Sequence, residues 1–303
     1  MTEQMNRVYY EPDSGSLFLD RNGIRERVIL LRRGFWDGFL PEIASILGDG
    51  GISLVMRKLV ERVGLSDVLT EKATFRTLID CFDRRILPLS REDSSLPESV
   101  TWGPHDREVV VFGDTIWILQ DVFTIQQLKV VLSELLDDNG ANAIMRSVSR
   151  KGGLSIWDIA LKNYGWTNLD TLIASQDKNV FQYTFSIAGW SITRSCFRPI
   201  SSDDYVLLVK CANTFESEGV VSDKPVCTIL TNYMEGFLEG VLSRLSEREK
   251  SVVCREVKCR AQGDDYCAFV LASKDKRDGI LDWDFIMHEY EVLDSTLTVP
   301  VAA

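Results

Sequence analysis

Two stretches of this chain repeat each other at a constant offset of 89 residues. ILGDGGISLVMRKLVERVGLS occupies residues 46–66 and LLDDNGANAIMRSVSRKGGLS occupies residues 135–155, with Met-Arg and Gly-Leu-Ser at equivalent positions. A short strand candidate precedes each copy, SLFL at 16–19 and TIWIL at 115–119. Helix–glycine–helix hairpins also resemble each other by chance, so two interpretations stay open. We favour a diverged partial duplication of a strand–helix–turn–helix unit.

The composition is typical of a soluble globular protein of one large or two modest domains. Apolar residues make up 45% and charged residues 26% of the 303 residues, and the net charge is −11. This acidic balance argues against direct binding to nucleic acid or to an anionic membrane. The N-terminus has no apolar run with a cleavage site, and no apolar segment reaches the length of a membrane span. We therefore expect a cytoplasmic protein.

Composition shifts along the chain predict four segments. A stretch rich in serine, proline and acidic residues, without periodicity, predicts a linker between the two copies of the repeat. The predicted segments are an N-terminal α/β region and dimerisation element (1–87), the linker (88–107), a main domain (108–275) and a C-terminal tail (276–303).

Within the main domain the residue pattern changes from helical to extended and back. Residues 155–165 and the following LDTLIAS predict helices, whereas 180–197 and 205–215 are β-branched and aromatic and predict strands. Residues 222–245 predict a helix that Ser222 or Asp223 would cap. Gly236 and Gly240 share one strip of that helix and would allow another element to approach closely. The chain then forms a predicted hairpin around Gly263.

The hairpin sequence CREVKCRAQGDDYCAF, residues 254–269, holds three of the seven cysteines. Pairing the strands around the turn places Cys259 opposite Cys267, which is compatible with two thiolates on one metal ion and also with a disulfide. Glu256 is near enough to join them if the strand bulges, and Cys227 begins the preceding helix. From the residues alone three interpretations remain: a zinc site, buried core thiols, or a disulfide.

Several motifs resemble the 4-vinyl-reductase-type domain. They are Pro225-Val226-Cys227, Asn213-Thr214-Phe215-Glu216, Glu256-x-x-Cys259 and Cys259-Arg-Ala-x-Gly-x-x-x-Cys267-x-Phe269. The resemblance covers roughly residues 108–272, and more loosely 8–80. It implies an α+β fold with an antiparallel sheet packed with helices, preceded by a helical N-terminal region. It also implies a homodimer and a structural zinc ion, Zn2+, on Cys227, Glu256, Cys259 and Cys267.

Domains of this type serve as sensors in aromatic-responsive bacterial activators, and a related fold builds transport-particle (TRAPP) subunits. The phenol sensors place a tryptophan where this chain has Cys211, and they use a pocket histidine that is missing here between His105 and His288. A ligand pocket between helices and sheet would still be lined by aromatic residues. The candidates are Trp157, Tyr164, Trp166, Phe181, Tyr183, Phe185, Trp190, Cys211, Phe215 and Tyr233.

We therefore expect a non-enzymatic sensor or regulatory protein, active in signalling or transcription regulation. It would bind a small hydrophobic or aromatic molecule and pass the change to a protein partner. The chain has no dinucleotide fingerprint, no phosphate loop and no plausible catalytic histidine, so an enzyme is the weaker hypothesis. The alternatives are an enzyme or accessory protein acting on a tetrapyrrole, and a TRAPP-like assembly subunit.

Overall fold

The computed structural model describes residues 6–65, 89–92, 94–105, 108–111, 115–174, 181–200, 204–246, 250–275 and 281–298. The chain divides into two compact units. Unit 1 comprises residues 1–148 and 187–189, and unit 2 comprises residues 149–186 and 190–303. The division falls within a helix, later than the linker predicted at 88–107. The reason is that strands within and after that linker complete the sheet of unit 1.

Unit 1 is built on a six-stranded antiparallel sheet with the order β1-β2-β3-β6-β5-β4. Each half of the sheet is a meander of three consecutive strands, and the two meanders meet where β3 pairs with β6. The strands are β1 (Arg7–Glu11), β2 (Ser16–Arg21), β3 (Ile24–Arg32), β4 (Val100–Trp102), β5 (Glu108–Val111) and β6 (Thr115–Asp121).

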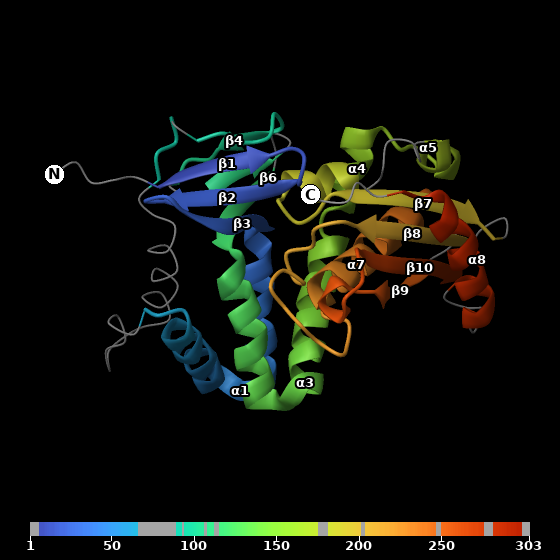
Figure 1. The fold of residues 1–303 in the computed structure, drawn as a ribbon. Coiled ribbons are helices and arrows are strands. Elements are labelled where there is room, and N and C mark those ends of the chain that lie inside the picture. Colours follow the sequence, from blue (N-terminus) through green and yellow to red (C-terminus); the bar gives the residue numbers. More distant parts are fainter. Residues whose placement is uncertain are drawn as a thin grey trace. The chain divides into compact units, whose positions relative to one another are not determined.

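A long helix follows each meander, α1 (Arg33–Arg62) after β3 and α3 (Val122–Leu154) after β6. Both helices leave the same side of the sheet and turn back at a break (Figure 1). The break lies at Gly48 in α1, with φ 69° and ψ 176°, and at Asp137 in α3, with φ 65° and ψ 174°. These positions are 89 residues apart. The structure thus confirms the predicted repeat and extends it to three strands per copy.

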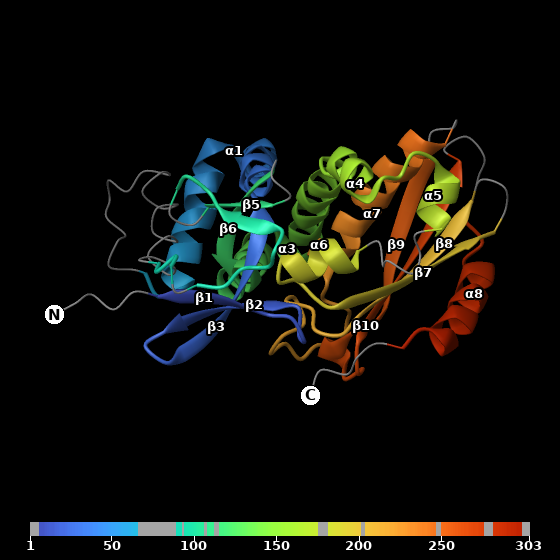
Figure 2. The same ribbon diagram turned by 90° about the horizontal axis from the view of Figure 1, so that it is seen from above.

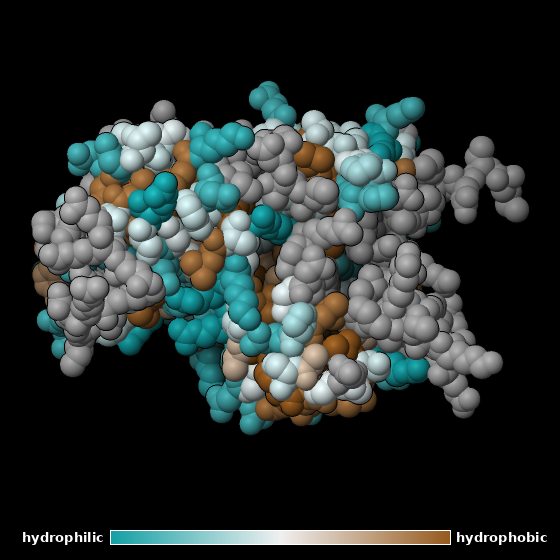
Figure 3. Space-filling view, turned by 180° about the vertical axis from the view of Figure 1, so that it is seen from behind, coloured by the Kyte–Doolittle hydropathy of each residue, from teal (hydrophilic) through white to brown (hydrophobic). Residues whose placement is uncertain are grey.

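The surface of α1 carries apolar side chains near its break. Ile46 and Leu54 are among the exposed large hydrophobic residues of the described chain. Figure 3 shows hydrophobic side chains gathered at the lower edge of the molecule, at the height where Figure 1 draws the two helix breaks. Within the described residues, no single helix is long and apolar enough to cross a membrane. The arms Gly38–Gly48 and Gly50–Arg62 meet that test only as a pair bent by 116°.

Unit 2 is an antiparallel sheet with the order β7-β8-β10-β9 and helices on both faces (Figure 2). Helix α7 packs on one face and α8 on the other. The elements are α4 (Trp157–Tyr164), α5 (Leu169–Ala174), α6 (Gln182–Ile187), β7 (Thr193–Pro199), β8 (Tyr205–Cys211), α7 (Thr228–Leu245), β9 (Lys250–Lys258), the 3₁₀ turn η3 (Arg260–Gln262), β10 (Cys267–Asp275) and α8 (Trp283–Thr296).

Two predicted strands are partly wrong. Residues 182–187 form helix α6, and the strand begins only at Thr193. The aromatic composition that predicted a strand instead serves helix α6, whose Phe185 packs against Phe181, the residue directly before the helix, with ring centroids 5.2 Å apart. The second predicted strand ends at Cys211, because residues 212–219 turn away from the sheet. The predicted helices at 155–165 and after Leu169 are confirmed.

The polar C-terminal segment contains helix α8, which covers one face of the sheet of unit 2. Ile286, Tyr290 and Leu293 of α8 form a buried cluster with apolar side chains of β8 and β10. The buried Lys210 ammonium lies 2.8 Å from the Asp294 carboxylate and donates to the carbonyl oxygens of Asp294 and Leu297. A lysine at a helix C-terminus satisfies carbonyls that the helix itself leaves unpaired.

Candidate metal centre

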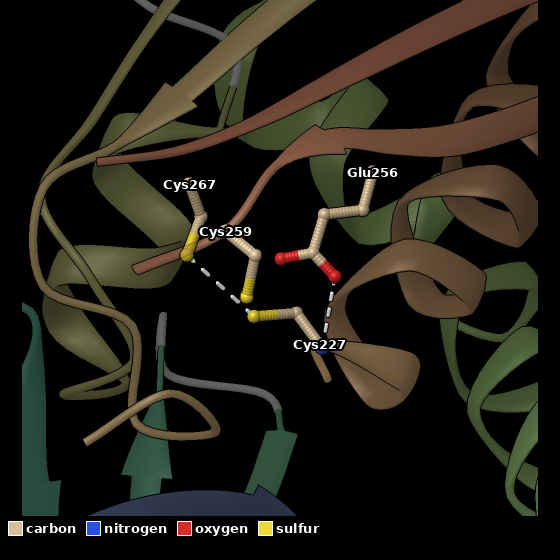
Figure 4. A group of neighbouring side chains, drawn as sticks. All are labelled: Cys227, Glu256, Cys259 and Cys267. Atoms are coloured by element: carbon tan, nitrogen blue, oxygen red, sulfur yellow. Dashed lines mark hydrogen bonds between the residues drawn. The ribbon is translucent and has the colours of Figure 1, made fainter. Parts of the chain in front are cut away.

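Four side chains from three segments of unit 2 converge on one point (Figure 4). They are Cys227 before α7, Glu256 on β9, Cys259 after β9 and Cys267 at the start of β10. One ligand atom from each lies within 4.8 Å of the others, and the three cysteines are buried. The structure therefore brings together all four residues that the sequence predicted, in an arrangement that could hold a metal ion.

A bulge in β9 explains how Glu256 joins the thiols. Residues three apart on a regular strand point to opposite faces, so Glu256 and Cys259 would normally diverge. In the structure Lys258 pairs with Ala268 and Glu256 pairs with Phe269, which leaves Val257 as an extra residue. An extra residue reverses the alternation of faces. Glu256 and Cys259 consequently face the same point.

Helix α7 begins beside the cluster but is not capped as predicted. Its first residue is Thr228, and the carboxylate of Glu216 accepts hydrogen bonds from the backbone of Ile229 and Leu230 at 2.9 and 2.8 Å. The predicted caps, Ser222 and Asp223, lie six and five residues before Thr228, which is too far from the helix start to cap it. The Cys227 backbone N–H is then left to donate to Glu256 Oε2 at 2.9 Å. This bond fixes the carboxylate against the start of the helix.

The turn between β9 and β10 holds the last two cysteines in place. Gly263 adopts a φ of 98°, which favours glycine, and the Cys259 N–H donates to the Asp264 carboxylate at 2.8 Å. The Arg260 N–H donates to Cys267 Sγ at 3.3 Å. Backbone donors of this kind favour the thiolate form of a cysteine.

Two hydroxyl residues that the sequence analysis assigned no role also contact the sulfur atoms. Thr214 Oγ1 lies 3.3 Å from Cys267 Sγ and 3.5 Å from Cys227 Sγ, and Ser217 Oγ lies 3.7 Å from Cys267 Sγ. Thr214 and the capping Glu216 both belong to the motif Asn213-Thr214-Phe215-Glu216. That motif was the signal that could have identified them. It forms a turn beside the four candidate metal ligands Cys227, Glu256, Cys259 and Cys267, which we call the metal cluster.

The ionisable groups of the cluster have pKa values shifted in opposite directions when no metal is bound. Burial, followed by the hydrogen bond to Cys259, raises the pKa of the Glu256 carboxyl to about 9. Hydrogen bonds from Cys227 and Cys259 lower the pKa of Cys267 to about 4. Burial also raises the pKa of Cys227 well above its ordinary range. At neutral pH the cluster therefore holds a Cys267 thiolate beside the protonated Glu256 carboxyl and Cys227 thiol, and a bound cation would displace these two protons.

The spacing of the sulfur atoms suits tetrahedral coordination. Cys227 Sγ and Cys267 Sγ lie 3.8 Å apart. A tetrahedral ion with metal–sulfur bonds of about 2.3 Å separates two of its sulfurs by roughly the same distance. Four protein ligands also fill a tetrahedral shell, so such a site is closed to substrate.

Two other buried cysteines of unit 2, Cys254 and Cys211, stay outside the cluster. Cys254 lies on β9, buried, and its N–H donates to the Glu235 carboxylate at 3.2 Å. Cys211 pairs with Cys267 across β8 and β10, and burial raises its pKa. The six cysteines in the described part of the chain are unbridged, so Cys259 and Cys267 do not form the disulfide left open by the sequence.

Contacts along α7 anchor the helix that follows Cys227. The Glu235 and Glu239 carboxylates accept hydrogen bonds from backbone N–H groups of β9, and Arg150 forms ion pairs with both. A Cβ atom at Gly236 would lie 2.1 Å from the Arg150 carbonyl oxygen, and one at Gly153 would lie 2.1 Å from the Tyr233 carbonyl oxygen. The predicted close approach along this helix is confirmed, and glycine is required on both sides of it.

Half of the predicted pocket residues lie together in one group of rings, and Phe237, which was not predicted, joins them. We define this aromatic cluster as Phe181, Phe185, Trp190, Phe215, Tyr233 and Phe237. Trp190 is at its centre, with its ring centroid 4.9 Å from Tyr233, 5.3 Å from Phe185 and 5.8 Å from Phe215. All six side chains are buried. Phe215 and Tyr233 link the aromatic cluster to the metal cluster, because Phe215 follows Thr214 and Tyr233 lies on α7.

The other predicted pocket residues lie elsewhere. Trp157 packs against Gly240, where a Cβ atom would lie 2.6 Å from its ring. Trp166 is buried after α4, and Cys211 ends β8 beside Cys267. The side chains of Tyr164 and Tyr183 are outside the described residues.

Comparison with known proteins identifies the domain that holds the cluster. Residues 207–273 match the family model of the 4-vinyl-reductase domain. No curated protein matches the chain. Several solved structures are similar at low identity, among them the following three. The phenol-responsive sensory domain of the transcription activator PoxR, solved with phenol, has 14% identity and a TM-score of 0.48, over 57% of this chain and 84% of that one.

The second is a protein of the H-NOX family studied for heme distortion, with 15% identity and a TM-score of 0.40, over 83% of this chain and 98% of that one. The third is trafficking protein particle complex subunit 3 from Naegleria fowleri, covalently bound to palmitic acid. It has 15% identity and a TM-score of 0.35, over 51% of this chain and 95% of that one. These TM-scores lie below 0.5, so the structural likenesses carry no functional inference.

Proposed function

Because residues 207–273 form a 4-vinyl-reductase domain, we propose that the protein is a non-enzymatic ligand sensor whose sensing domain is held together by zinc. The observation that carries the proposal is the closed set of three thiols and one carboxylate, which joins the start of α7 to both strands of the last hairpin. A closed site is structural, and a structural ion fixes the elements around it.

Zinc is the metal that this ligand set favours. Thiolates select soft or borderline ions, and a tetrahedral shell without a strong electronic preference is typical of zinc. Buried thiols that are free of disulfides also persist best in a reducing compartment, so we place the protein in the cytoplasm.

The aromatic cluster is the ligand-binding region in this proposal. It is buried and apolar, with a tyrosine hydroxyl and an indole N–H as polar groups, which suits a small hydrophobic or aromatic molecule. The rings pack against one another, so a ligand would enter only if they rearrange. Tyr233 belongs to α7, and zinc ties α7 to the β9–β10 hairpin. Ring movement would therefore shift helix and hairpin together, and a protein partner would detect that shift.

Metal analysis of the purified protein tests the zinc hypothesis. We expect about one zinc per chain in the wild type and well under half of that in Cys259→Ser and Cys267→Ser. Cys254→Ser is the matched control, because Cys254 is buried on the same strand but outside the cluster. Less than half an equivalent of zinc in the wild type would refute the site.

Titration with phenol tests the sensor hypothesis independently of the metal. We expect quenching or enhancement of tryptophan fluorescence that Trp190→Leu abolishes, together with a raised melting temperature. Trp166→Leu serves as the control, because Trp166 lies outside the aromatic cluster. No change with phenol, indole or a fatty acid, in zinc-loaded protein, would contradict a hydrophobic ligand in this cluster.

A further inference from the structure

The β3–β6 pairing at the centre of unit 1 has the symmetry of a dimer interface. Leu30 pairs with Leu119, and these two residues are 89 positions apart, the offset of the repeat. Leu30 therefore faces its own equivalent in the second copy. The flanking pairs are reciprocal, since Ile29 pairs with Gln120, the equivalent of Leu31, while Leu31 pairs with Ile118, the equivalent of Ile29.

Reciprocal pairing of this kind defines an isologous contact, in which residue i meets j and j meets i across a two-fold axis. The axis passes between Leu30 and Leu119, both fully buried. The reciprocity extends to the ends of the ladder, where Val28 pairs with Asp121 and Arg32 pairs with Trp117. A chance similarity of two helical hairpins would not reproduce this register.

Helices α1 and α3, which follow the two central strands, also correspond in backbone conformation and in the position of a glycine. Their breaks share φ and ψ within a few degrees at equivalent positions. Just after each break, a glycine lies against the preceding leucine. A Cβ atom at Gly51 would lie 2.0 Å from Leu47 Cβ, and one at Gly140 would lie 2.7 Å from Leu136 Cβ. Gly51 and Gly140 are again 89 residues apart.

The outer edges of the sheet leave little room for a further strand. Ser94 and Ser95 lie along β1, where Ser95 N–H donates to Val8 O at 2.8 Å and Tyr10 N–H donates to Ser95 O at 3.0 Å. The opposite edge is β4, with three residues. Covered or very short edges resist strand pairing with another chain.

We propose that unit 1 is a dimer contained within one chain, in which the second copy of the repeat occupies the place of a partner subunit. The sheet is then complete within one chain and does not need a second chain to form. This departs from the dimerisation that the sequence led us to expect in residues 1–87. Helix α3 of the second copy continues into unit 2. The two copies of the repeat together therefore precede a single 4-vinyl-reductase domain. The inference does not depend on the proposed ligand.

Engineered disulfides in the full chain test the proposal. Leu30→Cys with Leu119→Cys, and separately Leu31→Cys with Ile118→Cys, place thiols on directly opposed residues, at a separation that a disulfide can span. We expect both double variants to oxidise within one chain, with a monomer band on a non-reducing gel and a linked peptide pair in the mass spectrum. Each single variant is the matched control and should form no link.

A covalent dimer joined through these residues would overturn the proposal, because the two halves would then come from different chains. Absence of the linked peptide pair in both folded double variants would also overturn it, since the register would be wrong.

Discussion

Unit 1 and unit 2 hold their elements together by different means. Unit 1 uses one pattern twice, and its centre is a strand pair whose buried residues are mostly apolar, with Gln120 and Asp121 as buried polar exceptions. The described part of unit 2 contains no repeat of this kind. The start of its helix α7 contacts the β9–β10 hairpin through three thiols and one carboxyl group. These groups are costly to bury unless a cation or a proton neutralises them. Unit 1 therefore depends mainly on apolar packing, whereas unit 2 also depends on neutralising the ionisable groups at one point.

The largest effect should follow removal of the proposed zinc, which would act on unit 2 alone. Structural zinc contributes on the order of 10 kcal/mol to folding in small zinc-binding peptides. We expect a chelator, or Cys259→Ser, to abolish protection of β9, β10 and the start of α7 in hydrogen exchange. Protection of β3 and β6 in unit 1 should persist. Equal loss of protection in both units would contradict independent stabilisation.

The next effect concerns close helix packing in unit 2. Gly153→Ala and Gly236→Ala each place a Cβ atom 2.1 Å from a backbone carbonyl oxygen, so the helices must separate. We expect each to lower the free energy of unfolding by about 3 kcal/mol. The neighbouring Gly152→Ala meets no atom closer than 3.7 Å and should raise it by about 0.5–1 kcal/mol. Denaturant titration measures all three, and a loss at Gly152 would refute the packing argument.

A smaller effect tests the repeat in unit 1. Gly48 has a positive φ that strains residues with a side chain, although Asp137 adopts it at the equivalent break of α3, and nothing lies within 4 Å of the Gly48 Cβ position. Gly48→Ala should therefore cost about 1–3 kcal/mol through backbone strain alone. Gly50→Ala, also without neighbours, should be neutral or stabilising. If thermal unfolding shows equal costs at both positions, the break in α1 is not set by backbone conformation.

The smallest effect is a change in proton balance at the metal cluster. The unfolded Glu256 carboxyl loses its proton near pH 4.5 and the folded one near pH 9, so this group destabilises the metal-free fold as pH rises between these values. Cys267 acts in the opposite sense, since its folded pKa of about 4 lies below its ordinary value of 9.0. The two contributions oppose each other in metal-free wild type.

Metal binding makes this balance measurable. Zinc bound by Glu256 would displace the carboxyl proton at pH 7, so Glu256→Gln should release about one proton fewer per zinc bound. Calorimetry in buffers of different ionisation enthalpy counts the protons. An unchanged count would mean that Glu256 is already ionised before zinc binds, or that it is not a ligand.

Much of this protein could be predicted from its linear sequence. The repeat at offset 89 indicated the duplicated halves of unit 1, because helix breaks and glycines recur at fixed positions. The spacing of Cys227, Glu256, Cys259 and Cys267, with the resemblance it supports, identified the four residues that converge. These are local patterns, and local patterns can be recognised without knowing which segments meet in the fold.

Other features arise only when distant segments of the chain meet. The bulge at Val257 depends on pairing between two strands, and the capping of α7 by Glu216 depends on a turn that lies ahead of the helix. The aromatic residues at 181–187 became a helix because partners on α7 pack against them. The two-fold register of β3 and β6 likewise exists only once both strands pair. In each case the deciding partner comes from another part of the sequence, beyond the reach of local propensity.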